Sequence, residues 1–156
     1  MTQHIQSLAL QALGACPKWD RAVLTYLHAS TIAQAQSAWG PHAAALEAVE
    51  EQRGRPRCRH GRGWRAHREL ADEITARTCE IEEKAVREIW QPLWRASREL
   101  VATDAPTLAA ALMKAEVIQK EDVANDSEFP GDCMQILQAD FDRLAKAERS
   151  ALHADQ

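Results

Sequence analysis

The stretch WRAHRELADEITARTCEIEEKAVREIWQPLWRASRELVA, residues 64–102, carries the apolar pattern that decides the fold. Its apolar residues recur at steps of four and seven, which is the spacing of one helix face. They are Leu70, Ile74, Ile81, Ala85, Ile89 and Leu93. On the other faces an acid precedes a base by four positions, as in Glu80 with Lys84, and this order stabilises a helix. The pattern predicts one long helix over 64–102.

A helix of this length needs a partner. At ~1.5 Å per residue it spans roughly 55–60 Å, and such helices are stabilised by packing along their length, as in a coiled coil. The preceding segment, 19–52, is nearly as long and has apolar residues at helical spacing, interrupted at Gly40 and Pro41. About ten residues join the two segments. We therefore predict a long antiparallel helical hairpin.

The second half of the long helix is apolar over more than one side. Trp90 and Trp94 lie four residues apart on either side of Pro92, where a kink is expected. A wide apolar arc indicates two neighbouring helices. Two shorter helices, about 107–123 and 132–153, follow in the sequence, and Asp132 is a suitable N-cap for the second. We expect them to close the hairpin at its residue-102 end.

Composition favours helices throughout the chain. The sequence has 156 residues, and its 29 alanines equal Leu, Ile, Val and Phe together. Helices that pack closely through small side chains suit this ratio, whereas the β-branched and aromatic residues typical of strands are few. We predict a single all-α domain over 1–156, a helical bundle. The pattern over 1–17 is weaker and leaves open whether that segment is ordered.

An arginine-rich stretch separates the two predicted long helices. Residues 53–68 hold seven arginines and no acid, so the rest of a chain with formal charge −4 carries −11. We weigh three interpretations: a solvated loop over 53–63, a contact for an acidic protein, and a clamp for nucleic-acid phosphates with a tryptophan to stack on a base. The candidate polyanion-contact or acidic-partner residues are Arg53, Arg55, Arg57, Arg59, Arg62, Arg65, Arg68 and Trp64.

No catalytic constellation is recognisable. The chain has no P-loop, no GxGxxG, no GxSxG, no HExxH and no ExxH pattern. Cys58, His60 and His67 have a spacing that zinc could use, but the surrounding arginines disfavour a cation. Those same arginines would favour the thiolate of Cys58, although no base lies beside it. We predict a non-enzyme with no catalytic residues, no metal site and no cofactor.

The cysteines and the apolar segments bear on the compartment. Cys16, Cys58, Cys79 and Cys133 are scattered singly, which favours a reduced cytoplasm. Residues 13–16, Leu-Gly-Ala-Cys, resemble a lipoprotein cleavage box, but no Lys or Arg precedes them and polar residues interrupt the apolar run. No apolar run is long enough to span a membrane. We therefore predict a cytoplasmic protein without a membrane partner.

The last third of the chain resembles a recurring helical tail. A long helix ends in an Ala-Pro-Thr break, a Leu/Ala-rich helix follows, and a closing helix has the pattern Ile-Leu…Asp…Arg-Leu-Ala. The matching residues are Ala105 to Ala110, Lys114, Ala115, Ile136, Leu137, Asp140 and Arg143 to Ala145. Within 64–148 this is similar to uncharacterised small helical proteins of proteobacterial genomes and prophages. The resemblance implies a bacterial or phage origin and no particular activity.

These observations lead to one functional prediction and one alternative. An elongated helical surface without catalytic residues suits a protein-interaction or assembly module, and an inhibitor-type protein is one form of it. The lean apolar composition also predicts self-association, most simply as a dimer. The alternative is a nucleic-acid-binding protein that uses the arginine-rich stretch over 53–68.

Overall fold

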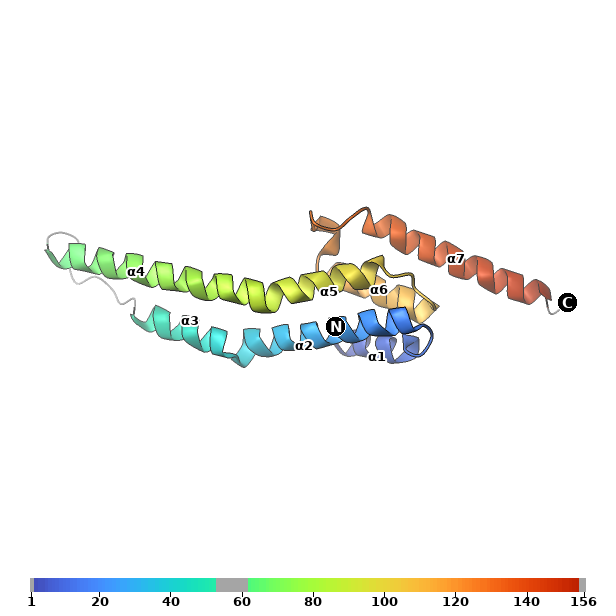
Figure 1. Ribbon diagram of the computed structural model, residues 1–156, viewed down its shortest axis with the longest axis horizontal. Helices are drawn as coiled ribbons and strands as arrows, with labels where there is room; N and C mark the ends of the chain where they lie inside the picture. The colour runs from blue at the N-terminus through green and yellow to red at the C-terminus, as the bar shows by residue number, and fades with distance from the viewer. Residues whose placement is uncertain (1, 53–61, 155–156) are drawn as a thin grey trace. The chain divides into compact units, whose positions relative to one another are not determined.

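The computed structural model describes residues 2–52 and 62–154, and within these ranges it contains helices and no strand (Figure 1). The elements in chain order are α1 (Thr2–Ala12), α2 (Pro17–Trp39), α3 (Pro41–Gln52), α4 (Arg62–Ala85), the π-helical η1 (Val86–Trp90), α5 (Gln91–Ala102), α6 (Leu108–Lys120), the 3₁₀-helical η2 (Val123–Asn125) and α7 (Cys133–Ala154). The prediction of an all-α helical bundle is confirmed.

The chain forms two compact units. We call the first the bundle unit; it consists of residues 1–29 and 93–156. The second, the hairpin unit, is Ser30–Pro92. Helix α2 begins in the bundle unit and ends in the hairpin unit, and the chain leaves the hairpin unit just after Pro92.

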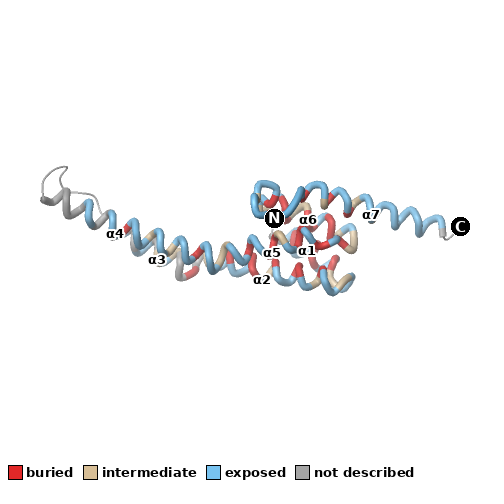
Figure 2. The backbone as a smooth tube through the Cα atoms, turned by 45° about the horizontal axis from the view of Figure 1, so that its top comes forward, coloured by how far each residue is buried: buried red, intermediate tan, exposed pale blue. Residues whose placement is uncertain are grey.

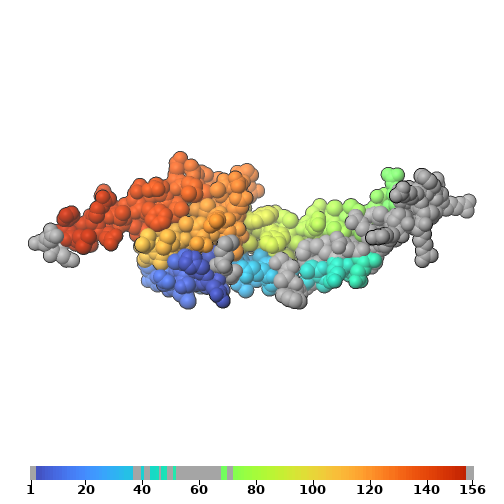
Figure 3. Space-filling view, turned by 180° about the vertical axis from the view of Figure 1, so that it is seen from behind, coloured from blue at the N-terminus to red at the C-terminus, as the bar shows by residue number. Residues whose placement is uncertain are grey.

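Of the described residues that are buried, most belong to the bundle unit, and their stretches of the backbone are red in Figure 2. Helix α6 packs against α1 on one side and against α7 on another. Figure 3 shows α7 lying along α6 and continuing beyond it, and residues 145–153 of α7 are exposed. The core of this unit includes Ile5, Leu8, Trp19, Val23, Tyr26, Leu100, Val101, Met113, Val117 and Leu137.

Local sequence signals set the helix ends in the bundle unit. Gly14 has φ +86°, the left-handed conformation that glycine adopts most easily, and Pro17 begins α2 where its missing N–H costs nothing. Thr107 caps α6, since its hydroxyl accepts from the Ala110 N–H at 3.2 Å. Asp132 caps α7 by accepting from the Met134 N–H at 2.8 Å. The predicted N-cap is confirmed.

The chain's first described segment is the amphipathic helix α1. Four of its residues are buried, and they fall on one face at helical spacing: Ile5, Leu8, Ala9 and Ala12. This face packs on α6. The periodicity of the segment is short, but it is sufficient once a neighbouring helix covers it.

The hairpin unit is built by α3 packing against α4. Helices α2 and α3 meet at the predicted break, where Gly40 separates Trp39 from Pro41. A Cβ added to Gly40 would lie 2.6 Å from the Cα of Gln36, so only glycine permits this close approach. The Ala44 N–H donates to the Gly40 carbonyl at 3.2 Å, which starts α3 directly after the break.

The predicted helix over 64–102 is present as a continuous run of α4, η1 and α5. Just before Pro92 the run widens into a π turn, in which the Gln91 N–H donates to the Val86 carbonyl five residues back. A proline in a regular α-helix clashes with the carbonyl four residues earlier, here that of Glu88. The π turn lies at this position, and π turns are a recognised site of helix kinks. The helix thus absorbs the proline without ending.

The seam predicted for the long helix is buried in part. Ile74, Ala85 and Leu93 are buried, whereas Ile81 and Ile89 are half-buried. Trp94 is 41% exposed, so this tryptophan is not a core residue. None of the described helices combines the length and the hydropathy needed to cross a membrane.

Candidate functional site: the groove of the helical hairpin

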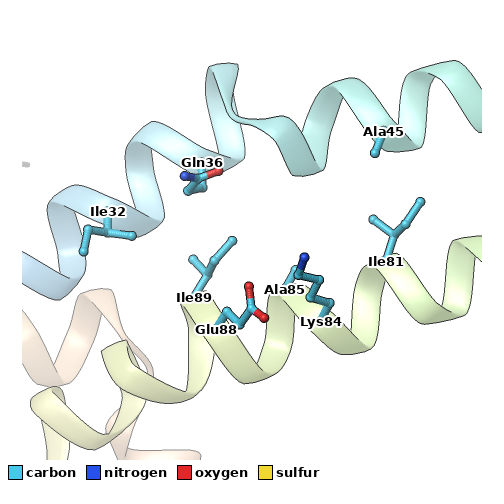
Figure 4. Close-up of a pocket in the computed structure, with 8 residues that line it drawn as sticks. All are labelled: Ile32, Gln36, Ala45, Ile81, Lys84, Ala85, Glu88 and Ile89. Atoms are coloured by element: carbon cyan, nitrogen blue, oxygen red, sulfur yellow. The ribbon is translucent and has the colours of Figure 1, made fainter.

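A groove of about 480 Å³ lies within the hairpin unit, between the α2–α3 arm and the α4–η1 arm (Figure 4). We call it the hairpin groove. Its lining residues are Ile32, Gln36, Ala45, Ile81, Lys84, Ala85, Glu88 and Ile89. In Figure 4 the side chains of Ile32 and Ala45 point from one arm toward Ile81 and Ile89 on the other. The walls of the groove are therefore mainly aliphatic.

The groove exists because the two arms do not fill the space between them. Among the described side chains of the hairpin unit, Ile74 is the one large apolar residue that is buried; Ala33 and Ala85 are small. Alanine at positions 45 and 85 leaves room where a larger residue would reach across. The break at Gly40 and Pro41 lies between the two lining segments of the α2–α3 arm. As a result, Ile32 remains 39% exposed.

Two charges of opposite sign stand at the rim of this groove. Lys84 and Glu88 are both exposed and lie four residues apart, so they share one face of the helix. Within the described part of the chain, neither takes part in an ion pair. An aliphatic floor with a charged rim has the chemistry of a docking surface for an apolar helix face. Sequence analysis identified Ile81, Ala85 and Ile89 as seam residues but not the groove.

A second apolar groove, of about 510 Å³, lies in the bundle unit between the start of α6 and the middle of α7. Leu108, Phe141, Leu144 and Ala145 supply its apolar lining, and Asp142 and Glu148 lie beside them. Phe141 and Leu144 are half-buried. Both ionisable groups of this lining are acidic, which distinguishes it from the hairpin groove.

The arginine-rich stretch is only partly described. Arg53, Arg55, Arg57 and Arg59 lie outside the described residues. The backbones of Arg62, Trp64 and Arg65 form the first turn of α4, and their side chains lie outside the described part. Arg68 is exposed on α4. The structure does not bring any described candidate of this group into the hairpin groove.

The candidate zinc ligands also lie mainly outside the described part of the chain. Cys58 and His60 are not described, and neither is the side chain of His67. In the ranges that are described, no three residues of the His, Cys, Asp and Glu types come together as a metal site would require. Burial raises the pKa of the Cys133 thiol, so this cysteine is less reactive than a free one.

A buried polar cluster in the bundle unit was not identified from the sequence. The side chain of Lys114 on α6 is fully buried, and its Nζ lies 2.5 Å from Asp140 Oδ2 on α7. Asp140 Oδ1 accepts from Arg143 at 2.7 Å and from the Ala105 N–H at 3.1 Å. Arg143 also donates to the Ala105 carbonyl at 2.5 Å. The cluster therefore joins α6, α7 and the connection between α5 and α6.

The charges of the cluster are coupled. Burial of the Lys114 ammonium lowers its pKa, and the hydrogen bond to Asp140 opposes that effect. Burial by itself would raise the pKa of Asp140, but the hydrogen bonds from Lys114, Arg143 and the Ala105 N–H outweigh it and the pKa is lowered. Asp140 is the counter-ion that allows the Lys114 ammonium to be buried. Lys114, Asp140 and Arg143, the three charged residues among those that carry the resemblance, all belong to this cluster.

Acid should weaken the cluster. The folded pKa of Asp140 lies below its ordinary value of 3.8, so between the two values the unfolded chain binds more protons than the folded one. The stabilisation from Asp140 is present above 3.8 and is lost as pH falls through the folded pKa. Urea denaturation at about pH 7, 5 and 3 should show the stability difference between the wild type and Asp140→Asn shrinking at the lowest pH. A difference that stays constant with pH would contradict this assignment.

The fold and the groove define the class: an all-α helical bundle with a two-helix hairpin. Beyond that class, no protein-family model matches the chain, and it matches no curated protein and no solved structure. Functional inference therefore depends on the residues of the site.

Proposed function

We propose that this chain is a non-enzymatic protein-interaction or assembly module that docks an apolar helix face in the hairpin groove. The observation that carries the proposal is the groove itself, with aliphatic walls from both arms and two charges at its rim that form no ion pair with any described residue. Pockets that bind substrates hold a few polar groups that converge on the ligand. Here Lys84 and Glu88 are the titratable groups of the described lining, and both are exposed at the rim.

Burial of the groove's apolar side chains supplies the driving force. Ile81 and Ile89 are half-buried and Ile32 is more exposed than either, so a docked helix would remove apolar surface of all three from water. Complete burial of an isoleucine side chain contributes about 1.5–3 kcal/mol relative to full exposure. Three partly exposed isoleucines together provide several kcal/mol, which is enough to support specific docking when the partner helix is complementary in shape.

The sequence supports a proposed origin and a proposed cellular location for this module. The tail that resembles small helical proteins supports a bacterial or phage protein, and the single, scattered cysteines support the cytoplasm. An inhibitor-type protein that occupies a partner's surface is one form of the proposed module. The alternative function is nucleic-acid binding through the arginines of 53–68, supported by seven positive charges within that range.

Filling the groove should abolish docking. In an Ala85→Trp variant the indole would occupy space that a partner's side chains need. We expect any protein captured from the source cell by the tagged full-length chain to be lost, with binding reduced at least about ten-fold, as for the loss of a central hot-spot contact. Capture on the tagged protein followed by mass spectrometry, with the wild type processed in parallel, measures this effect.

Ala76→Trp is the matched control, because Ala76 is exposed on the same helix and does not line the groove. It should retain whatever the wild type captures. Circular dichroism should show both variants to be as helical as the wild type. If both tryptophan variants capture the same proteins as the wild type, the groove is not the docking surface. Binding of a labelled DNA or RNA duplex by all three proteins at moderate salt would favour the alternative function.

A further inference from the structure

We propose that the occupant of the hairpin groove is the hairpin of a second copy of this chain, packed antiparallel across a two-fold axis near Val86, the midpoint between Lys84 and Glu88. This inference rests on the proposed docking function of the groove and names its partner. The two hairpins would form a four-helix assembly in which each fills the other's groove.

The charges at the rim are self-complementary. In an antiparallel pair of identical helices, residues on one side of the axis face residues an equal distance on the other side. An axis between Lys84 and Glu88 therefore sets Lys84 of one copy opposite Glu88 of the other, and the reverse pair forms by symmetry. Both side chains are exposed and neither forms an ion pair within the described ranges, so both are available.

The apolar lining follows the same symmetry. Ile81 and Ile89 lie five residues before and three residues after this axis, so Ile81 of one copy comes within two positions of Ile89 of the other. Figure 4 shows this row along one arm, with Lys84 and Glu88 beside it. An unrelated helix would have to supply this pattern in the same order, whereas a second copy already carries it.

Charge reversal tests the pairing. In Lys84→Glu both symmetric contacts become Glu with Glu, and in Glu88→Lys both become Lys with Lys. Each single variant should weaken self-association at least about ten-fold at low salt, because like charges then face one another twice. An equimolar mixture of the two single variants should associate again, since each of the two contacts between unlike copies then joins one acid and one base. The double variant Lys84→Glu/Glu88→Lys should also associate like the wild type.

Sedimentation velocity and light scattering on the full chain at tens of micromolar provide the readout, with thermal melting to confirm that the exposed substitutions leave the fold intact. The wild type should have twice the 17.4 kDa mass of one chain. A wild type of 17.4 kDa would overturn the inference, as would single variants that associate normally or a mixture that does not recover. If the wild type is monomeric and Ala85→Trp still loses a captured protein, the docking function stands and only its assignment to a second copy fails.

Discussion

An Asp140→Asn variant is expected to lose about 3–5 kcal/mol of unfolding free energy at neutral pH, the usual cost of removing one partner from a buried ion pair. The side chain of Lys114 is fully buried and has this carboxylate as its counter-ion at 2.5 Å. Asparagine keeps the shape of the side chain but removes the negative charge, so Lys114 and Arg143 would be left together without this anion. The lowered pKa of Lys114 limits the loss, because the lysine can release its proton instead.

Urea denaturation followed by circular dichroism measures this change, and Asp142→Asn is the matched control. Asp142 lies two residues further along α7, is exposed, and accepts a hydrogen bond from Gln138 at 2.9 Å. Its replacement should change stability by no more than about 0.5 kcal/mol. A double variant, Lys114→Met with Asp140→Leu, should recover most of the loss because it removes both charges of the buried pair. Equal effects of the two asparagine substitutions would show that the buried pair is not formed.

Trp19→Ala should be the other severe substitution, at about 3–5 kcal/mol. Trp19 lies at the start of α2 with 0% of its surface exposed, and it is among the largest fully buried side chains of the bundle unit. Alanine would leave a cavity. The close-packed side chains around it can shift only partly to fill it. Thermal and urea unfolding of the full chain would both register the loss, as a lower midpoint with little change in helical content before the transition.

Two comparisons separate the cavity from other effects. The Nε1 of Trp19 has no hydrogen-bond partner among the described residues, so Trp19→Phe removes an unsatisfied donor and should cost only about 1 kcal/mol. Trp94 is the matched control of the same residue type, since it is 41% exposed; Trp94→Ala should cost less than about 1 kcal/mol. If Trp94→Ala proved as costly as Trp19→Ala, the burial of these two residues would not explain their energetics.

The positions of the helices follow largely from the sequence. The helix over 64–102, the break at Gly40 and Pro41, and the cap at Asp132 are local properties: each depends on residues a few positions apart. Apolar spacing, missing proline N–H groups and capping side chains act over one or two turns, so they can be read without knowledge of the neighbours. The same is true of the absence of strands from the described ranges.

The groove could be predicted only in part. The periodicity correctly assigned Ile81, Ala85 and Ile89 to the face toward the other arm, but it did not locate a groove there. Whether a seam closes depends on the side chains opposite it. Those belong to a segment 36 to 57 residues away, from Ala45–Ile81 to Ile32–Ile89, and no local pattern sets its register. Alanine at position 45, together with the break at Gly40, decides that the arms leave a groove.

Which polar and aromatic side chains are buried was decided by the tertiary structure alone. In the sequence Lys114 is one lysine within an alanine-rich helix, and nothing about the residue type distinguishes Trp19 from Trp94. Folding buries Lys114 because Asp140, 26 residues further along, meets it inside the bundle unit. It buries Trp19 and leaves Trp94 exposed because burial depends on which helix covers a face. Local spacing determines where a helix forms and which face is apolar, whereas long-range packing determines what each side chain meets.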